Sequence, residues 1–315
     1  MKKHNTLQHL EKRLEPPLGC SSKENPMKKH LSTILLIMIL LIGLSLLLYP
    51  TFSDWWNSFH QSRAIATYSE QVTNLDNDQY EEIWNAAWEY NQLLIERMNA
   101  FILSDEQKEQ YESLLDVGGN GIMGYIEIPS ISVSLPIYHG TEESVLQIAV
   151  GHLEWTSLPV GGDGSHCVLS GHRGLPSARL FTDIDQLVVG DEFLLQILDE
   201  TLTYEVDQIL IVEPQDTDAL QIIEGKDYCT LVTCTPYGIN THRLLVRGHR
   251  VETQEAARTV RVTADAIQIE PLVVAPLVGV PMLLILLIVI MVNDSRKARR
   301  RHRMERSNNC NDNKI

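Results

Sequence analysis

The sequence lacks internal repeats and low-complexity tracts, and it lacks the excess of basic residues that nucleic-acid-binding proteins carry. Its formal charge is −15, which argues against a general nucleic-acid binder because such a protein needs basic surface to meet phosphates. Apolar residues make up 44% and charged residues 21% of the 315 positions. This ordinary globular composition excludes a wholly disordered chain, and the length suits one large domain or two small ones with appendages.

Charge is distributed unevenly along the chain. Residues 1–30 hold seven Lys/Arg against three Asp/Glu, residues 293–315 hold eight against three, and residues 31–292 hold 11 against 35. Two apolar runs lie at the boundaries: 31–49 has no charge over 19 positions, and 272–292 has none over 21. Each run is long enough to cross the hydrocarbon layer of a membrane as a helix, which takes about 20 residues. The sequence therefore predicts two transmembrane helices.

The first run could instead be the apolar core of a signal peptide. It is longer than the usual core of roughly 7–15 residues, and Tyr49, Pro50 and Phe52 follow it in place of a small-residue cleavage site. An uncleaved helix is therefore expected. Basic flanks stay on the cytoplasmic side, so we expect both termini inside and residues 50–270 outside. The basic C-terminal segment could also be a nucleic-acid or anionic-lipid patch, but its place directly after an apolar run favours the topological role.

Cysteine is scarce, and its spacing suits no zinc motif. Cys20 and Cys310 lie in the predicted cytoplasmic tails, which leaves Cys167, Cys229 and Cys234 outside. An odd number guarantees at least one unpaired thiol. In an exported domain such a thiol is a candidate reactive group.

The outer body divides into a helical collar and a β domain. Residues 54–115 carry apolar side chains at three- and four-residue steps, which is typical of helices, and Ser104 with Gln107 is a near match to a capping box. Beyond the glycine-rich segment 117–124 the period becomes two, so several short strands over about 130 residues predict a β-barrel or sandwich. The candidate strands are Gly124–Ile128, Val133–Ile137, Val145–Val150, His166–Ser170, Glu192–Ile197, Leu202–Ile211, Tyr228–Thr233 and Arg243–Arg250.

Three side chains with suitable chemistry lie at the ends of these strands. Cys234 sits where an apolar strand stops, whereas Cys229 and Cys167 lie within strands and are interpreted as small buried residues. His172 ends another strand between glycines, which leaves backbone room for a substrate, although a lone histidine is most often surface or satisfied core. Arg243 opens an apolar strand and is either an ordinary edge charge or a source of fixed donors for an oxyanion.

Together, a thiol, an imidazole and a guanidinium could form an acyl-transfer site. The thiolate would attack a carbonyl, the imidazole would pass a proton to the leaving amine, and the cation would hold the oxyanion. From residue types alone this combination is only suggestive.

Three segments carry a specific resemblance. They are LSGHRG (169–174), TLVTCTPYGINTHRLLVRGHR (230–250) and MGYIEIPSISVSLPIYHG (123–140). They closely resemble the sortases, in particular the pilus-building class C sortases of Gram-positive bacteria, and the similarity extends from Tyr49 to the end of the second apolar run. The sortase motif TLxTC with a downstream arginine matches 230–234 and Arg243.

The resemblance implies a mainly β fold: a sortase-like eight-stranded β-barrel with an N-terminal helical collar, flanked by two transmembrane helices. It implies a cysteine transpeptidase without a cofactor, in which Cys234 is the nucleophile, His172 the general acid/base and Arg243 the oxyanion or substrate-orienting cation. The implied substrates are pilins or other surface proteins with an LPxTG-like sorting signal, cleaved after Thr and transferred to a pilin lysine.

The expected organisation follows the chain from end to end. It comprises a basic cytoplasmic tail (1–30), a transmembrane helix (31–49), an extracellular helical collar with a lid-region loop (50–120), the catalytic β-barrel (121–255), a juxtamembrane linker (256–271), a second transmembrane helix (272–292) and a basic cytoplasmic tail (293–315).

One departure from the family concerns the lid. Class C sortases often carry an Asp-Pro-aromatic triplet before the barrel, and this chain has RMNAFILSD at 97–105 instead. Phe101 could plug the site from an altered lid, or the lid could be absent. Two other functions also stay open: a sortase that attaches proteins to a peptidoglycan amine, and a non-enzymatic surface binding module in which Cys234 is structural.

Overall fold

The computed structural model of the protein describes residues 26–96 and 103–253, together with the single positions 288, 292 and 296. The possible lid residue Phe101 lies outside the described residues, and so does the second predicted transmembrane helix except at two isolated positions. The chain divides into two compact units, residues 1–47 and 48–315. All the residues discussed below as a site belong to the second unit.

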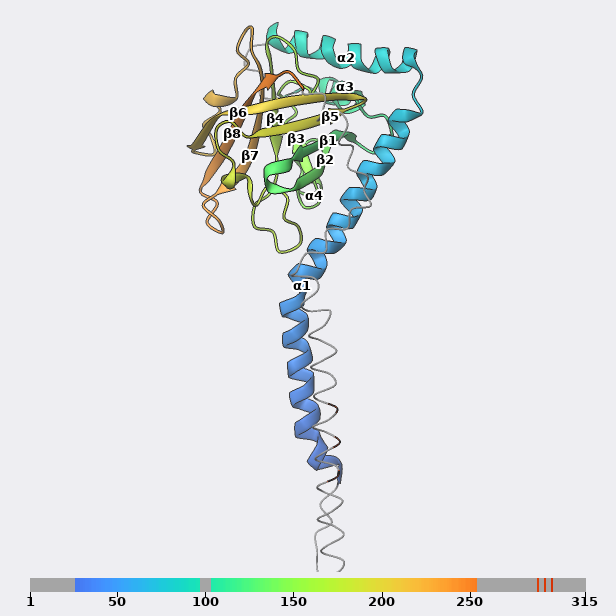
Figure 1. The fold of residues 1–315 in the computed structure, drawn as a ribbon, viewed down its shortest axis with the longest axis vertical. Helices are drawn as coiled ribbons and strands as arrows, with labels where there is room; N and C mark the ends of the chain where they lie inside the picture. Colours follow the sequence, from blue (N-terminus) through green and yellow to red (C-terminus); the bar gives the residue numbers. More distant parts are fainter. Residues whose placement is uncertain (1–25, 97–102, 254–287, 289–291, 293–295, 297–315) are drawn as a thin grey trace, which may run out of the picture. The chain divides into compact units, whose positions relative to one another are not determined.

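Long helices come first in the chain and short strands follow (Figure 1). The helices are α1 (Pro26–Thr73), α2 (Asn77–Glu96), α3 (Asp105–Ser113) and α4 (Glu143–Leu146), with 3₁₀ turns η1 (Pro129–Ile131), η2 (Ile184–Gln186) and η3 (Asp218–Leu220). The strands are β1 (Ile122–Ile128), β2 (Val133–His139), β3 (Val150–His152), β4 (Ser165–Ser170), β5 (Glu192–Ile197), β6 (Glu200–Val212), β7 (Asp227–Thr235) and β8 (His242–Val251).

The eight strands close into a barrel in the order β1-β2-β3-β4-β7-β8-β6-β5. Two neighbouring pairs, β2–β3 and β4–β7, run parallel, and the others run antiparallel. The mainly β, eight-stranded barrel expected from the sequence is therefore confirmed. The parallel pairing of β4 with β7 brings the ends of both strands to the same edge of the barrel.

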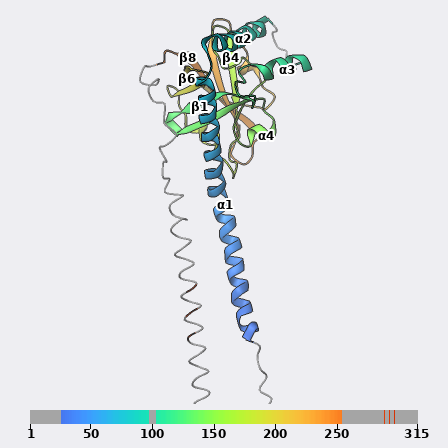
Figure 2. The same cartoon turned by 90° about the vertical axis from the view of Figure 1, so that its right-hand side faces the viewer.

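The main apolar core lies inside this barrel. One cluster joins buried side chains from β1, β4, β5, β6, β7 and β8, among them Ile126, Leu169 and Phe193. Tyr90 of α2 and Tyr111 of α3 join the same cluster, so these helices pack onto the barrel through buried side chains. Figure 2 shows α2 and α3 next to the strands. The predicted helical collar is thus part of the core.

One predicted strand was wrong in its position. The segment Val145–Val150 was expected to be a strand, but α4 occupies Glu143–Leu146 and β3 begins only at Val150. The Ala149 N–H donates to the Val145 carbonyl over 2.9 Å, so the first part of this segment is helical. Because the run is only six residues long, its apolar pattern fits either period.

The helix boundaries follow local capping chemistry. The Asp76 carboxylate accepts a hydrogen bond from the Gln79 N–H at the start of α2, and Ser104 and Gln107 form the predicted capping box of α3. Helix α1 continues without interruption through Pro50. Among the described residues, one helix, α1 over 37–73, is long and apolar enough to span a membrane, which suggests anchoring at the N-terminal side.

Candidate active site

Cys234 and Arg243 are direct cross-strand neighbours. Cys234 is the penultimate residue of β7, Arg243 is the second residue of β8, and the antiparallel register pairs the two. Directly opposed residues of an antiparallel pair project from the same face with their Cβ atoms about 5 Å apart. Both side chains are partly exposed. The structure therefore brings the predicted thiol and guanidinium together.

His172 lies beside Cys234 through the parallel pairing of β4 with β7. Ser170 pairs with Val232 at the last position of that ladder. Beyond it, the Thr233 hydroxyl donates to the Gly171 carbonyl over 2.7 Å, and the Arg173 guanidinium donates to the Thr235 hydroxyl over 3.4 Å.

Both of these contacts join residues 62 apart in the chain, and the same separation relates His172 to Cys234. The pairing therefore continues on both sides of His172 and Cys234. We infer that the backbone of His172 lies next to that of Cys234 at the barrel edge.

The two faces of β7 have different surroundings. Cys229 and Leu231 belong to the core inside the barrel, whereas Val232 belongs to a second, smaller cluster with Val168 and Leu245. Since side chains alternate along a strand, Cys234 projects on the Val232 side, which we call the outer face.

The outer face carries an apolar floor next to Cys234. Its other members come from the loops on either side of the strands and from β6: Leu153, Trp155, Leu210, Val212, Ala219 and Leu220. By the same alternation Arg243 lies on this face, beside Leu245 of β8. A thiol, a guanidinium and an apolar surface thus share one side of the barrel.

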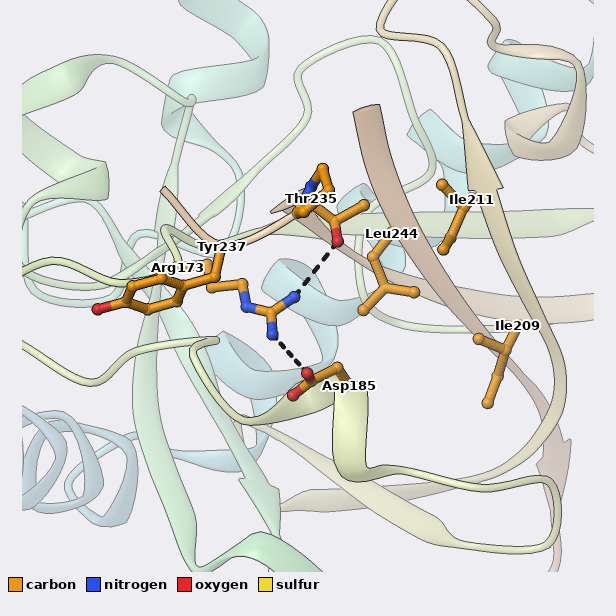
Figure 3. A pocket seen from close by; sticks show the side chains of 8 residues that line it. Arg173, Asp185, Ile209, Ile211, Thr235, Tyr237 and Leu244 are labelled. Atoms are coloured by element: carbon orange, nitrogen blue, oxygen red, sulfur yellow. Dashed lines mark hydrogen bonds and ion pairs between the residues drawn. The ribbon is translucent and has the colours of Figure 1, made fainter. Parts of the chain in front are cut away.

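An open cavity of about 620 Å³ lies beside the same strand ends (Figure 3), and its lining includes the exposed side chains Ile211 and Tyr237. Ile209, Ile211, Thr235 and Leu244 are among the residues that line it, while Cys234 does not line it. The cavity therefore backs onto the candidate site without containing the thiol.

Arg173 spans the edge of this cavity. Its guanidinium lies between Thr235 and Asp185, donating to the Thr235 hydroxyl and forming an ion pair with the Asp185 carboxylate (Figure 3). Because Arg173 follows His172 and Thr235 follows Cys234, this bridge ties together the two segments that carry the candidate imidazole and thiol.

The glycines near His172 leave space for aromatic side chains of the protein, and not for a substrate as predicted. A Cβ atom at Gly171 would collide with the Phe181 ring, and one at Gly174 would collide with the Tyr237 ring. Gly174 also has a positive φ of 74°, which glycine adopts without strain. The backbone room predicted for a substrate is thus filled by two aromatic rings of the protein.

The arginines of β8 have distinct partners. Arg243 donates from Nη1 to the carbonyl oxygens of His242 (3.2 Å) and Asn240 (3.4 Å) in its own loop. A guanidinium has five N–H groups, so others remain for a substrate. Arg247 instead forms two 2.9 Å hydrogen bonds with Asp207, and its guanidinium lies 4.2 Å from the centre of the Tyr228 ring.

The two other cysteines of the described chain are core residues, as expected. Cys167 and Cys229 are fully buried and directly paired across β4 and β7. Burial raises the pKa of the Cys229 thiol well above its ordinary value, which keeps it protonated and unreactive. Within the described residues, no group of three or more His, Cys, Asp and Glu side chains could hold a metal ion.

Two elements of the site were missed by the sequence reasoning. Arg173 and Thr235 directly follow the candidate histidine and cysteine, and strand alternation alone would have placed both on the face opposite those residues. The apolar floor also left a signal, because CVL in β4 and LLV in β8 are continuous apolar runs. Such runs are typical of strands that are covered on both faces.

Comparisons with known proteins agree with this architecture. The family model for the Sortase domain matches residues 126–251. Sortase D of Bacillus subtilis is 33% identical over 131 residues, which cover 41% of this chain and 63% of that protein. The chain thus spans little more than six-tenths of the length of the first curated relatives it matches.

Solved structures give more extensive matches. Sortase C1 of Streptococcus agalactiae is 54% identical, with a TM-score of 0.59, and the match covers 61% of this chain and all of that chain. Sortase C of Clostridium perfringens, solved with the C-terminal cell wall sorting motif, is 44% identical with a TM-score of 0.53, over 61% of this chain and 99% of that chain.

These matches define an enzyme family. The chain belongs to the sortases, whose members are cysteine transpeptidases, and the solved structures it resembles at this identity are class C sortases.

Proposed function

We propose that this protein is a membrane-anchored class C sortase that cleaves LPxTG-like sorting signals after Thr and transfers the acyl group to a pilin lysine. The observation that carries the proposal is the pairing at the barrel edge, where Cys234 faces Arg243 across β7 and β8 and His172 continues the β4–β7 register. Roles follow from chemistry: Cys234 is the nucleophile, His172 the general acid/base, and Arg243 the oxyanion or substrate-orienting cation.

The reaction takes place in two halves. The Cys234 thiolate attacks the Thr carbonyl of the sorting signal, Arg243 stabilises the negative oxygen of the tetrahedral intermediate, and His172 donates a proton to the leaving amine as the C–N bond breaks. The lysine amine of the acceptor then attacks the thioester. Its proton passes to His172 and the thiolate leaves, which restores the enzyme.

The outer-face floor supports a peptide substrate. The apolar cluster of Val168, Val232 and Leu245 is buried beneath neighbouring side chains such as Trp155, so it supports the backbone of the strand ends along which an extended sorting signal would lie next to Cys234. The acceptor pilin lysine is proposed from the class C resemblance.

Location is the second part of the proposal. The apolar run in α1 anchors the chain in the lipid bilayer, the second run at 272–292 adds another span, and basic flanks keep both termini in the cytoplasm with the catalytic domain outside. This arrangement places Cys234 where exported substrates pass.

The central test is acyl-enzyme formation with an LPxTG-type peptide, followed by mass spectrometry. We expect Cys234→Ala to form no acyl-enzyme, and His172→Ala to turn over no substrate because the leaving amine needs a proton. Cys229→Ala and Cys167→Ala are the matched controls, which should stay active since both thiols lie in the core. A Cys234→Ala protein that still forms the acyl-enzyme would overturn the assignment.

A further inference from the structure

A row of aromatic side chains lies exposed on α1 directly after the apolar run. This aromatic stripe consists of Tyr49, Phe52, Trp55, Trp56 and Phe59, each between 50% and 62% exposed. The Phe52 ring centroid lies 5.8 Å from that of Trp55 and 6.4 Å from that of Trp56. The His60 ring lies 4.7 Å from that of Trp56 and 5.8 Å from that of Phe59, so these rings form one surface. Single exposed apolar residues are ordinary, but a contiguous patch of this kind marks an interaction site.

The opposite side of the same helix segment binds the catalytic domain. Its hydrogen bonds run from Asn57 Nδ2 to the Ser177 carbonyl (2.7 Å), from Gln61 Nε2 to the Ile148 carbonyl (2.7 Å) and from the Arg179 N–H to the Asp54 carboxylate (2.8 Å). At about 100° per residue, these polar residues and the aromatic stripe are centred roughly half a turn apart. The stripe therefore faces away from the domain that the polar side holds.

We propose that the aromatic stripe lies in the headgroup layer of the lipid bilayer and so fixes which face the catalytic domain presents outward. The stripe is continuous with the uncharged run 31–49 in one helix, and Tyr49 ends that run. Tyr and Trp are enriched at membrane–water boundaries because their rings are apolar and their O–H and N–H groups reach water. The five side chains carry no charge, which suits lipid as their partner, and the exposed His60 ring beside Trp56 and Phe59 adds a polar group suited to the headgroup layer.

The length of the stripe sets the inclination of this helix segment. From Tyr49 to Phe59 a helix rises about 15 Å, whereas each headgroup layer is roughly 5–8 Å thick. The segment must therefore lie obliquely for the whole stripe to reach the headgroups.

The test uses the full chain in phosphatidylcholine–phosphatidylglycerol vesicles, with tryptophan as the probe. Two proteins are compared, each with four of its five tryptophans replaced by Phe: one keeps Trp56 and the other keeps Trp88 of α2. These side chains are similarly exposed, at 51% and 45%. We expect brominated phosphatidylcholine to quench Trp56 and aqueous iodide to leave it bright, with the reverse for Trp88.

Other outcomes overturn the proposal. If iodide quenches Trp56 as strongly as Trp88, the stripe is in water. If neither quencher reaches Trp56, a second copy or another part of the chain covers it. The proposal rests on anchorage by the N-terminal run, so vesicle sedimentation is measured separately. A protein that sediments with the vesicles while Trp56 stays unquenched by bromine contradicts the stripe alone, and one that fails to sediment contradicts the anchorage.

Discussion

At the scale of single residues, Arg243 and Arg247 of β8 have different partners and therefore different expected roles. Arg243 faces Cys234, and its bonds go to loop carbonyls. Arg247 lies four residues farther along the strand, about 13 Å away, and is held by Asp207 and Tyr228. One oxyanion cannot accept hydrogen bonds from both.

The first prediction compares lysine substitutions at these positions. Arg243→Lys should lower turnover on the order of 10²-fold, as for loss of one oxyanion donor, because an ammonium cannot reproduce the planar fork of donors. Arg247→Lys should leave turnover nearly unchanged and lower the free energy of unfolding by about 1–2 kcal/mol, since a bidentate ion pair and a cation–π contact are weakened. Peptide kinetics and urea unfolding of both variants measure this, and the reverse pattern would show that Arg247 serves the site.

The bridge made by Arg173 gives a second prediction. Arg173→Met keeps the apolar stem but removes the link to Thr235 and Asp185, so His172 and Cys234 lose a shared support. We expect kcat to fall roughly 10-fold or more with KM little changed, because small misplacements of catalytic groups are costly. The control is Arg179→Met, which breaks an ion pair with Asp183 in the same loop and should leave kcat unchanged. Equal losses in both variants would show a general effect on the loop.

At the scale of elements, β4 and β7 are joined on the outer face by His166. Its Nδ1–H donates to the Gln221 carbonyl over 2.9 Å, and its Nε2 accepts from the Thr230 hydroxyl over 2.7 Å. Because one ring nitrogen donates and the other accepts, these two hydrogen bonds require the neutral imidazole of His166. Burial is the main reason that the pKa of His166 falls to about 4, and the nearby Arg247 adds to the effect.

The pH dependence of stability follows from that shift. Between about pH 6.5 and 4 the unfolded chain binds a proton at His166 that the folded chain does not, so stability is full above pH 6.5 and is lost as pH falls toward 4. The loss from this residue is up to about 3 kcal/mol. Urea unfolding from pH 7 to 4 should show a weaker pH slope for His166→Gln than for the unchanged protein. An identical slope would mean that other groups, such as His139, carry the effect.

Sequence patterns predicted the elements better than their contacts. Short alternating or apolar runs located seven of the eight strands, and the capping box located α3, because both signals are local. The six residues from Val145 were misassigned since so short a run fits two periods. Likewise, GHRG suggested space around His172, but only the tertiary structure shows the rings of Phe181 and Tyr237 in that space.

For the candidate site, too, the residues could be predicted from the sequence but their contacts could not. Cys234 and Arg243 could be chosen from motif and strand position. Their direct pairing depends on the β7–β8 register, which is set by the loop 236–241 and cannot be read from local sequence patterns. The cavity behind Thr235 depends on residues from β6, β8 and the β4–β5 loop. No local pattern in the sequence joins these segments.

At the scale of the whole molecule, the topology of the chain gives a final prediction. With a different epitope tag at each terminus, protease added to intact protoplasts should digest residues 50–270 and leave both tags intact, because the proposed topology, based on the basic flanks, has both tails inside. Loss of the C-terminal tag alone would show that the run at 272–292 does not span the membrane. Protection of the central body would contradict an external catalytic domain.

The constant separation of 62 residues between the partners on β4 and β7 restricts how this protein can be re-engineered. The chain between the two strands can be lengthened in its loops, but a single residue inserted between Cys167 and His172 would change the phase of one strand relative to the other. It would turn the imidazole toward the barrel interior and bring Arg173 to the thiol's side. Only a matching insertion before Cys234 restores the alignment of His172 with Cys234. The lengths of the two segments must therefore be changed together.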